Sequence, residues 1–150
     1  MPDSISSLSE KHDALKPQRY TEIYEDYFSS LRNTRLNILE LGILKGGSLK
    51  LWAEYFPNSQ VAGIDIDNVE IQDKSDRIHI YQGEQQDRAF LDRVRQEVAP
   101  DGFDIIIDDA SHIGLYTRES FWHLFDNHLV NGGGDLCHRG LGYRLLAGVA

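Results

Sequence analysis

Two aspartates and a histidine, Asp108, Asp109 and His112, follow the most apolar run of the chain, in the stretch FDIIIDDASH (103–112). Carboxylate oxygens are preferred ligands of a hard divalent cation such as magnesium, and a bound cation can acidify a hydroxyl group that it holds. A neutral imidazole can then accept the proton. These residue types therefore indicate cation binding and proton transfer. The alternative for His112 is a loop histidine that bonds only to backbone groups.

A second group of residues that could do chemistry lies in ELGILKGGSLKLW (40–52), where an acid precedes several small residues. The group consists of Glu40, Gly42, Gly46, Gly47 and Ser48. Glycine lets backbone amides approach a ligand closely, and a helix N-terminus favours negative charge. The dinucleotide fingerprint G-x-G-x-x-G is not met, because Leu44 stands at its second glycine. A structural tight turn would explain the glycines but not the acid.

A third acid, Asp65, ends the run QVAGIDI (60–66). A carboxylate in this position commonly binds both hydroxyls of a ribose, since it can accept several hydrogen bonds. Together with Glu40, Gly42 and the glycine turn, Asp65 indicates a cofactor that contains adenosine.

Short apolar runs and amphipathic stretches alternate along the chain, which predicts an α/β fold. The expected helices are 17–32, 47–56, 88–98 and 118–130, and the expected strands are 36–42, 60–66, 78–84 and 103–110. Strands this apolar predict a parallel sheet covered by helices on both faces. The acidic residues then lie at the carboxyl ends of the strands, where such sheets bind ligands.

Composition limits the function classes. A chain of 150 residues fits one domain, and a net charge of -9 disfavours a nucleic-acid partner, which requires a basic face. The apolar runs are too short to span a membrane, and the polar N-terminus does not resemble a secretion signal. The single cysteine, Cys137, suits a reducing cytoplasm, which is the expected location.

The order E-x-G-x-x-x-G-G-S followed by GIDID resembles class I S-adenosylmethionine-dependent methyltransferases. With LWAEYFP and DDASH, the chain resembles the metal-dependent sugar O-methyltransferases of macrolide and related natural-product pathways over residues 17–134. The resemblance implies a Rossmann-like parallel sheet, S-adenosylmethionine and magnesium as cofactors, and methyl transfer to a hydroxyl of a glycosylated small molecule. Formation of a homo-oligomer is left open.

The resemblance also implies roles for individual residues. Those expected at the cofactor are Glu40, Gly42, Gly46, Gly47, Ser48, Asp65, Gly83, Glu84 and Asp108. Gly42, Gly46 and Gly47 would lie along the methionine portion, and Asp108 would approach the methionine ammonium. Asp109 corresponds to a metal ligand, and His112 to the general base. The segment KHDALKPQRY (11–20) departs from the family's glycine-threonine-aspartate-lysine element, which puts its substrate contacts in doubt.

The C-terminal stretch does not continue the pattern. In the family a fifth strand ends in adjacent Glu and Asp that complete the metal site, whereas here DLCHRGLGYRLLAGVA (135–150) follows. One back-translation of this stretch, with its first nucleotide deleted, reads IYVIEDWGTGYWPEW. We therefore expect a flexible segment 1–16, a cofactor-binding domain 17–134 and an out-of-frame tail 135–150. A naturally short variant with an unusual tail is the alternative.

The catalytic status of the chain is consequently open. Only Asp109 of three expected metal carboxylates is present, so turnover would be weak or absent. The alternative functions are a cofactor-binding fragment without catalysis and, disfavoured by the failed glycine fingerprint, an NAD-dependent oxidoreductase.

Overall fold

The computed structural model describes residues 2–72, 74–110 and 114–127. Its centre is a four-stranded parallel sheet in the order β3-β2-β1-β4. The strands are β1 (Asn37–Leu41), β2 (Gln60–Asp65), β3 (Ile78–Gln82) and β4 (Ile105–Asp108). The expected parallel α/β sheet is thus confirmed, with each strand one to four residues shorter than the apolar run that predicted it.

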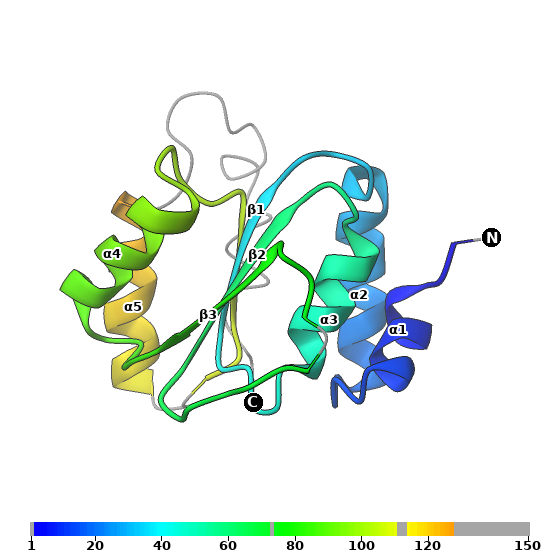
Figure 1. The fold of residues 1–150 in the computed structure, drawn as a ribbon, viewed down its shortest axis with the longest axis horizontal. Helices are drawn as coiled ribbons and strands as arrows, with labels where there is room; N and C mark the ends of the chain where they lie inside the picture. The colour runs from blue at the N-terminus through cyan, green and yellow to red at the C-terminus, as the bar shows by residue number, and fades with distance from the viewer. Residues whose placement is uncertain (1, 73, 111–113, 128–150) are drawn as a thin grey trace.

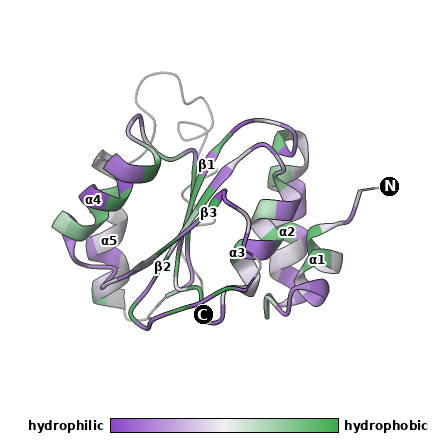
Figure 2. Cartoon of the chain, viewed as in Figure 1, coloured by the Kyte–Doolittle hydropathy of each residue, from purple (hydrophilic) through white to green (hydrophobic). Residues whose placement is uncertain are grey.

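Helices cover both faces of the sheet (Figure 1). On one side lie α1 (Ile5–Lys11), α2 (Gln18–Phe28) and α3 (Gly47–Tyr55), with a short 3₁₀ turn at Ser29–Leu31. On the other side lie α4 (Arg88–Val98) and α5 (Gly114–Asn127). Both hydrophilic and hydrophobic residues occur on the helices (Figure 2), as expected for helices that bury one face. Within the described residues, none of the helices has the length and hydrophobicity that a membrane span requires.

Each face of the sheet has its own hydrophobic core. The core under α1–α3 is rich in aromatic side chains, and Trp52 packs edge-on against Tyr24 and Phe28 with ring centroids 5.4 and 5.9 Å apart. The core under α4 and α5 is built mainly from aliphatic side chains around Phe90 and Phe103. Because strands β1 and β4 are buried on both faces, their sequences are largely apolar.

The N-terminal segment differs from the flexible stretch expected for residues 1–16. Residues 5–11 form a helix, whose N-cap Ser4 accepts a hydrogen bond from the Ser7 N–H. Ile5 and Leu8 are fully buried in the aromatic core, and the Ile5 N–H donates to Glu25 at 2.7 Å. Burial of these two apolar side chains offsets the entropy of ordering a short segment.

The last helix also begins earlier than expected, at Gly114 rather than 118. The expected end of that helix at 130 and the expected out-of-frame tail 135–150 lie outside the described residues. They remain expectations of the sequence.

Candidate functional site

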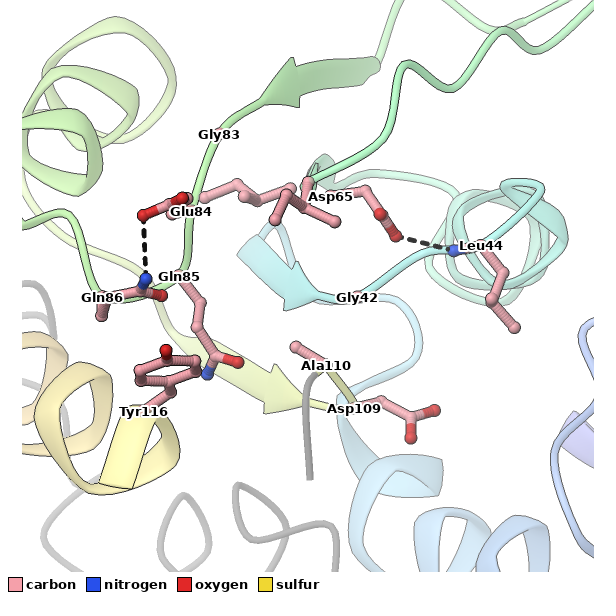
Figure 3. Close-up of a pocket in the computed structure, with 12 residues that line it drawn as sticks. Gly42, Leu44, Asp65, Gly83, Glu84, Gln85, Gln86, Asp109, Ala110 and Tyr116 are labelled. Carbon is pink, nitrogen blue, oxygen red and sulfur yellow. Dashed lines mark hydrogen bonds between the residues drawn. The ribbon is translucent and has the colours of Figure 1, made fainter. Parts of the chain in front are cut away.

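A cavity of about 370 Å³ opens at the carboxyl ends of the strands (Figure 3). Its walls come from the segments that follow all four strands and from the start of α5. The lining residues used below are Gly42, Leu44, Asp65, Ile66, Gly83, Glu84, Gln85, Gln86, Asp109, Ala110 and Tyr116. The volume lies within the range of small-molecule sites, and the wall combines apolar side chains with a few carboxylates. We call this end of the sheet, where the carboxyl termini of the four strands lie, the rim.

The residues predicted from the sequence fall into three groups. The cavity is lined by Gly42, Asp65, Gly83, Glu84 and Asp109. Glu40, Gly46, Gly47, Ser48 and Asp108 belong to the same end of the sheet but are not among the lining residues. His112 lies outside the described residues. The ligand contacts of all these residues therefore remain predictions, with five of them placed at a cavity.

Asp65 holds the loop that follows β1. One of its oxygens, Oδ2, accepts hydrogen bonds from the backbone N–H groups of Ile43 and Leu44 at 2.9 and 3.0 Å (Figure 3 shows the second). The other, Oδ1, accepts from the Asp67 N–H at 3.1 Å. A carboxylate offers about four acceptor positions, so roughly one is left for a ligand. The expected grip on two ribose hydroxyls would require Asp65 to share or exchange a backbone contact.

The backbone conformation and the packing at position 42 require a glycine there. Its φ of +82° lies in the left-handed region, and a Cβ there would lie 2.5 Å from the Cα of Ala110 and in contact with the Asp109 carbonyl oxygen. Only glycine fits such a position without strain. The residue thus allows the chain to pass closely between the ends of β1 and β4, next to the cavity.

Lys16 was not predicted as a site residue, yet it joins two acids that were. Its Nζ lies 2.7 Å from Glu40 Oε1 and 2.7 Å from Asp109 Oδ2. The Lys16 side chain is 4% exposed and that of Glu40 is fully buried. Burial by itself would lower the pKa of Lys16, but the charges of Glu40 and Asp109 outweigh burial and raise it. Lys16 is therefore held as an ammonium.

Asp108 is bonded to two residues that line the cavity, Ala110 and Gln85, and Gln85 links it to α5. Its Oδ1 accepts from the Ala110 N–H at 3.2 Å, and its Oδ2 accepts from Gln85 Nε2 at 3.3 Å. The same amide donates to Ser120 Oγ on α5 at 3.1 Å. Asp108 is 7% exposed. Its predicted contact with a methionine ammonium is untested, and Gln85 is a buried polar cavity residue that no sequence pattern indicated.

The two cofactors implied by the resemblance fit unequally. The cavity suits S-adenosylmethionine in kind, because Ile66 and Leu44 offer apolar surface while Asp65 and Glu84 offer carboxylates for hydroxyl and amino groups. Magnesium fits poorly: among the described residues there is no cluster of three or more His, Cys, Asp or Glu side chains that could hold a metal ion. Asp109 alone offers too few ligands, and Lys16 already occupies one of its oxygens.

Comparison with known proteins identifies relatives of the chain, although no family model matches it. It is 42% identical over 134 residues to the 8-demethyl-8-(2-methoxy-alpha-L-rhamnosyl)-tetracenomycin-C 3'-O-methyltransferase of Streptomyces olivaceus, covering 83% of the chain and 34% of that protein. It is 40% identical over 121 residues to the mycinamicin VI 2''-O-methyltransferase of Micromonospora griseorubida, covering 76% of the chain and 29% of that protein. The chain thus spans about a third of the length of these curated relatives.

Solved structures agree. The MycE methyltransferase from the mycinamycin biosynthetic pathway, in complex with Mg and SAH, superposes with a TM-score of 0.77 at 35% identity, covering 85% of this chain and 35% of that one. A putative ribosomal RNA methyltransferase from Plasmodium falciparum shares the fold, at a TM-score of 0.56 and 20% identity. The chain therefore has the Rossmann-like fold of class I methyltransferases, and its sequence matches about a third of the length of sugar O-methyltransferases that act in natural-product pathways.

Proposed function

We propose that this chain carries the cofactor-binding part of an S-adenosylmethionine-dependent O-methyltransferase whose acceptor is a hydroxyl of a glycosylated small molecule. The observation that carries the proposal is the cavity at the carboxyl ends of β1–β4, found in a chain whose relatives are named as sugar O-methyltransferases. Those relatives are about three times as long, so activity and acceptor are proposals for the chain.

When bound, S-adenosylmethionine would supply an electrophilic methyl group. The chain's own residues would bind and orient it: Ile66 and Leu44 would cover its apolar surface, and Glu84 would accept a hydrogen bond from it. Asp109 lines the same cavity (Figure 3), and by resemblance the acceptor hydroxyl would approach it. By resemblance His112 would take the proton of that hydroxyl. Alignment of the two reactants would supply much of the acceleration.

Isothermal titration with S-adenosylhomocysteine, and in parallel with NAD, tests the cofactor half. We expect binding of S-adenosylhomocysteine only. Glu84→Gln should weaken this binding, since the cavity loses a carboxylate. Glu22→Gln is a matched control, because Glu22 and Glu84 are both exposed and each accepts a hydrogen bond from a nearby glutamine amide. Gln86 donates to Glu84 at 2.8 Å, and Gln18 donates to Glu22 at 3.0 Å. Binding of NAD instead would refute the proposal.

A methyl-transfer assay with a rhamnosylated acceptor and added magnesium tests the catalytic half. Methylation would support an active enzyme. Binding of S-adenosylhomocysteine without methylation of any sugar hydroxyl would favour the second reading, a cofactor-binding chain without turnover, and would remove the catalytic part of the proposal.

A further inference from the structure

We infer that Lys16 is a positioning residue, whose ammonium ties the acid at the end of β1 to the acid that follows β4 and so holds one wall of the ligand cavity in place. The inference rests on the proposed function, because the ligand that this wall would serve is S-adenosylmethionine. It concerns a residue that lies in neither the glycine turn nor the acidic motif after β4.

The contacts of Lys16 span two neighbouring strands. Its Nζ is 2.7 Å from Glu40 Oε1 and 2.7 Å from Asp109 Oδ2, and β1 pairs with β4 directly beside them, Leu41 opposite Asp108. Both carboxylates therefore approach the same point at the rim. Without a cation between them, two acids so close would repel each other, one of them being fully buried. The ammonium offsets that repulsion and leaves the group with one net negative charge.

The backbone is bent in an unusual way to deliver Lys16. Residues 12–16, which we call the strap, connect α1 to α2, and within it Asp13 and Leu15 have φ values of 50° and 53°. Side chains in this left-handed region carry a strain that persists only where surrounding contacts enforce it. The Ala14 N–H donates to the Ser9 carbonyl at 2.9 Å, and the Lys16 N–H donates to Ser9 Oγ at 3.4 Å.

The strap also lies directly on the start of α3. A Cβ on Gly47 would contact the His12 carbonyl oxygen and lie 2.8 Å from that of Asp13. Gly47 therefore faces the strap, and it is not among the residues that line the cavity. Two features of the sequence, a strained strap and a glycine that makes room for it, serve the placement of one lysine. Backbone strain of this kind is retained where the position of a side chain is important to the fold or to a site.

Each carboxylate keeps one oxygen that Lys16 does not use. Within the described part of the chain, Glu40 Oε2 is buried and has no hydrogen-bond partner. Asp109 is 42% exposed and lines the cavity. Fixing one oxygen of each acid fixes the place of the other, so Asp109, which lines the cavity, offers a ligand an acceptor that is already oriented. Loss of the ammonium should let Asp109 turn into solvent and disorder this wall.

The test compares Lys16→Met with Lys11→Met. Lys11 is a matched control, because it lies in the same N-terminal segment and pairs with a carboxylate, Glu54, at 2.6 Å, but it is 52% exposed and is not among the cavity residues. By titration of S-adenosylhomocysteine, we expect Lys16→Met to bind about tenfold more weakly or worse, which is a loss of roughly 1.4 kcal/mol. Lys11→Met should bind as the unchanged protein does. Lys16→Arg should recover part of the affinity, because a guanidinium can donate to two carboxylates.

A second measurement does not need the ligand. In nitrogen-15 spectra of lysine ammonium groups, a buried and doubly bonded Lys16 should give a slowly exchanging Nζ signal that Glu40→Gln and Asp109→Asn each shift. If Lys16→Met does not fold, Lys16→Met/Glu40→Gln removes one carboxylate together with the ammonium and replaces it in the titration.

The outcomes separate the two proposals. Normal affinity in a folded Lys16→Met variant, or an Nζ signal that neither acid variant shifts, would overturn the positioning role and leave the proposed function intact. Absence of S-adenosylhomocysteine binding by the unchanged protein would overturn the proposed function and the positioning role together, while the Nζ signal would still report whether the bridge exists.

Discussion

Replacement of Gly42 by alanine should destabilise the fold more than the same replacement at any other glycine of the rim. Two costs add at this position. The left-handed φ of +82° costs an alanine roughly 1–2 kcal/mol. The new Cβ would also lie 2.5 Å from the Cα of Ala110 and against the Asp109 carbonyl, which are backbone atoms of the segment that follows the neighbouring strand β4. Overpacking of this kind costs about 1–3 kcal/mol. The sum is about 2–5 kcal/mol, a large part of a typical stability of 5–15 kcal/mol.

Gly83→Ala is the matched comparison. Its Cβ would lie 2.5 Å from Cζ of the Phe90 ring, but the obstacle is a side chain and the backbone of Gly83 is not left-handed. Only the overpacking cost of about 1–3 kcal/mol applies, and a smaller side chain in Phe90→Leu should recover part of it. Urea unfolding followed by circular dichroism gives both free energies. A loss below 1 kcal/mol in Gly42→Ala, or a loss smaller than in Gly83→Ala, would refute the reasoning.

Three further predictions use the same unfolding assay. Leu8→Ala should cost about 2–5 kcal/mol because Leu8 is fully buried, and a negligible loss would show that α1 does not pack as described. Asp87→Ala should cost about 1 kcal/mol because the Asp87 carboxylate caps α4 by accepting from the Phe90 N–H at 3.1 Å, whereas Asp87→Asn should keep most of that stability. Burial, and secondly the charge of Lys74, lowers the pKa of His79 below its ordinary value of 6.5. The unfolded chain therefore binds a proton at His79 more tightly than the folded chain does, and the free energy of unfolding should fall as the pH drops through 6.5. The substitution His79→Gln should make that fall smaller.

The strands and most helices could be predicted because their signals are local. A strand buried on both faces reads as an apolar run, and α4 was placed at its observed bounds, 88–98, from amphipathic spacing alone. The helix α1 was missed because its seven residues are too few to show a period. Only the tertiary contacts of Ile5 and Leu8 reveal why it forms.

The acids of the rim were predicted for the same reason, since each ends an apolar run. Their partners were not, because those contacts are long-range. Lys16 and Asp109 are 93 positions apart, and a lysine before a proline reads as part of an exposed linker. The contacts of Asp65 with Ile43 and Leu44 depend on the path of the loop after β1, where Leu44 has a φ of 47°. The residue type alone carries no sign of that path.

These partners change what the rim can offer a ligand. A parallel sheet gathers acids where its strands end, and such acids are already bonded within the protein: Glu40 and Asp109 to Lys16, Asp108 to Gln85, and Asp65 to backbone N–H groups. A ligand therefore meets carboxylates whose orientation is fixed, with only some of their oxygens open. Affinity should then depend on residues that never contact the ligand. For this reason, substitutions at Lys16 are more informative about the site than substitutions of the acids, which remove a ligand contact and a structural bond together.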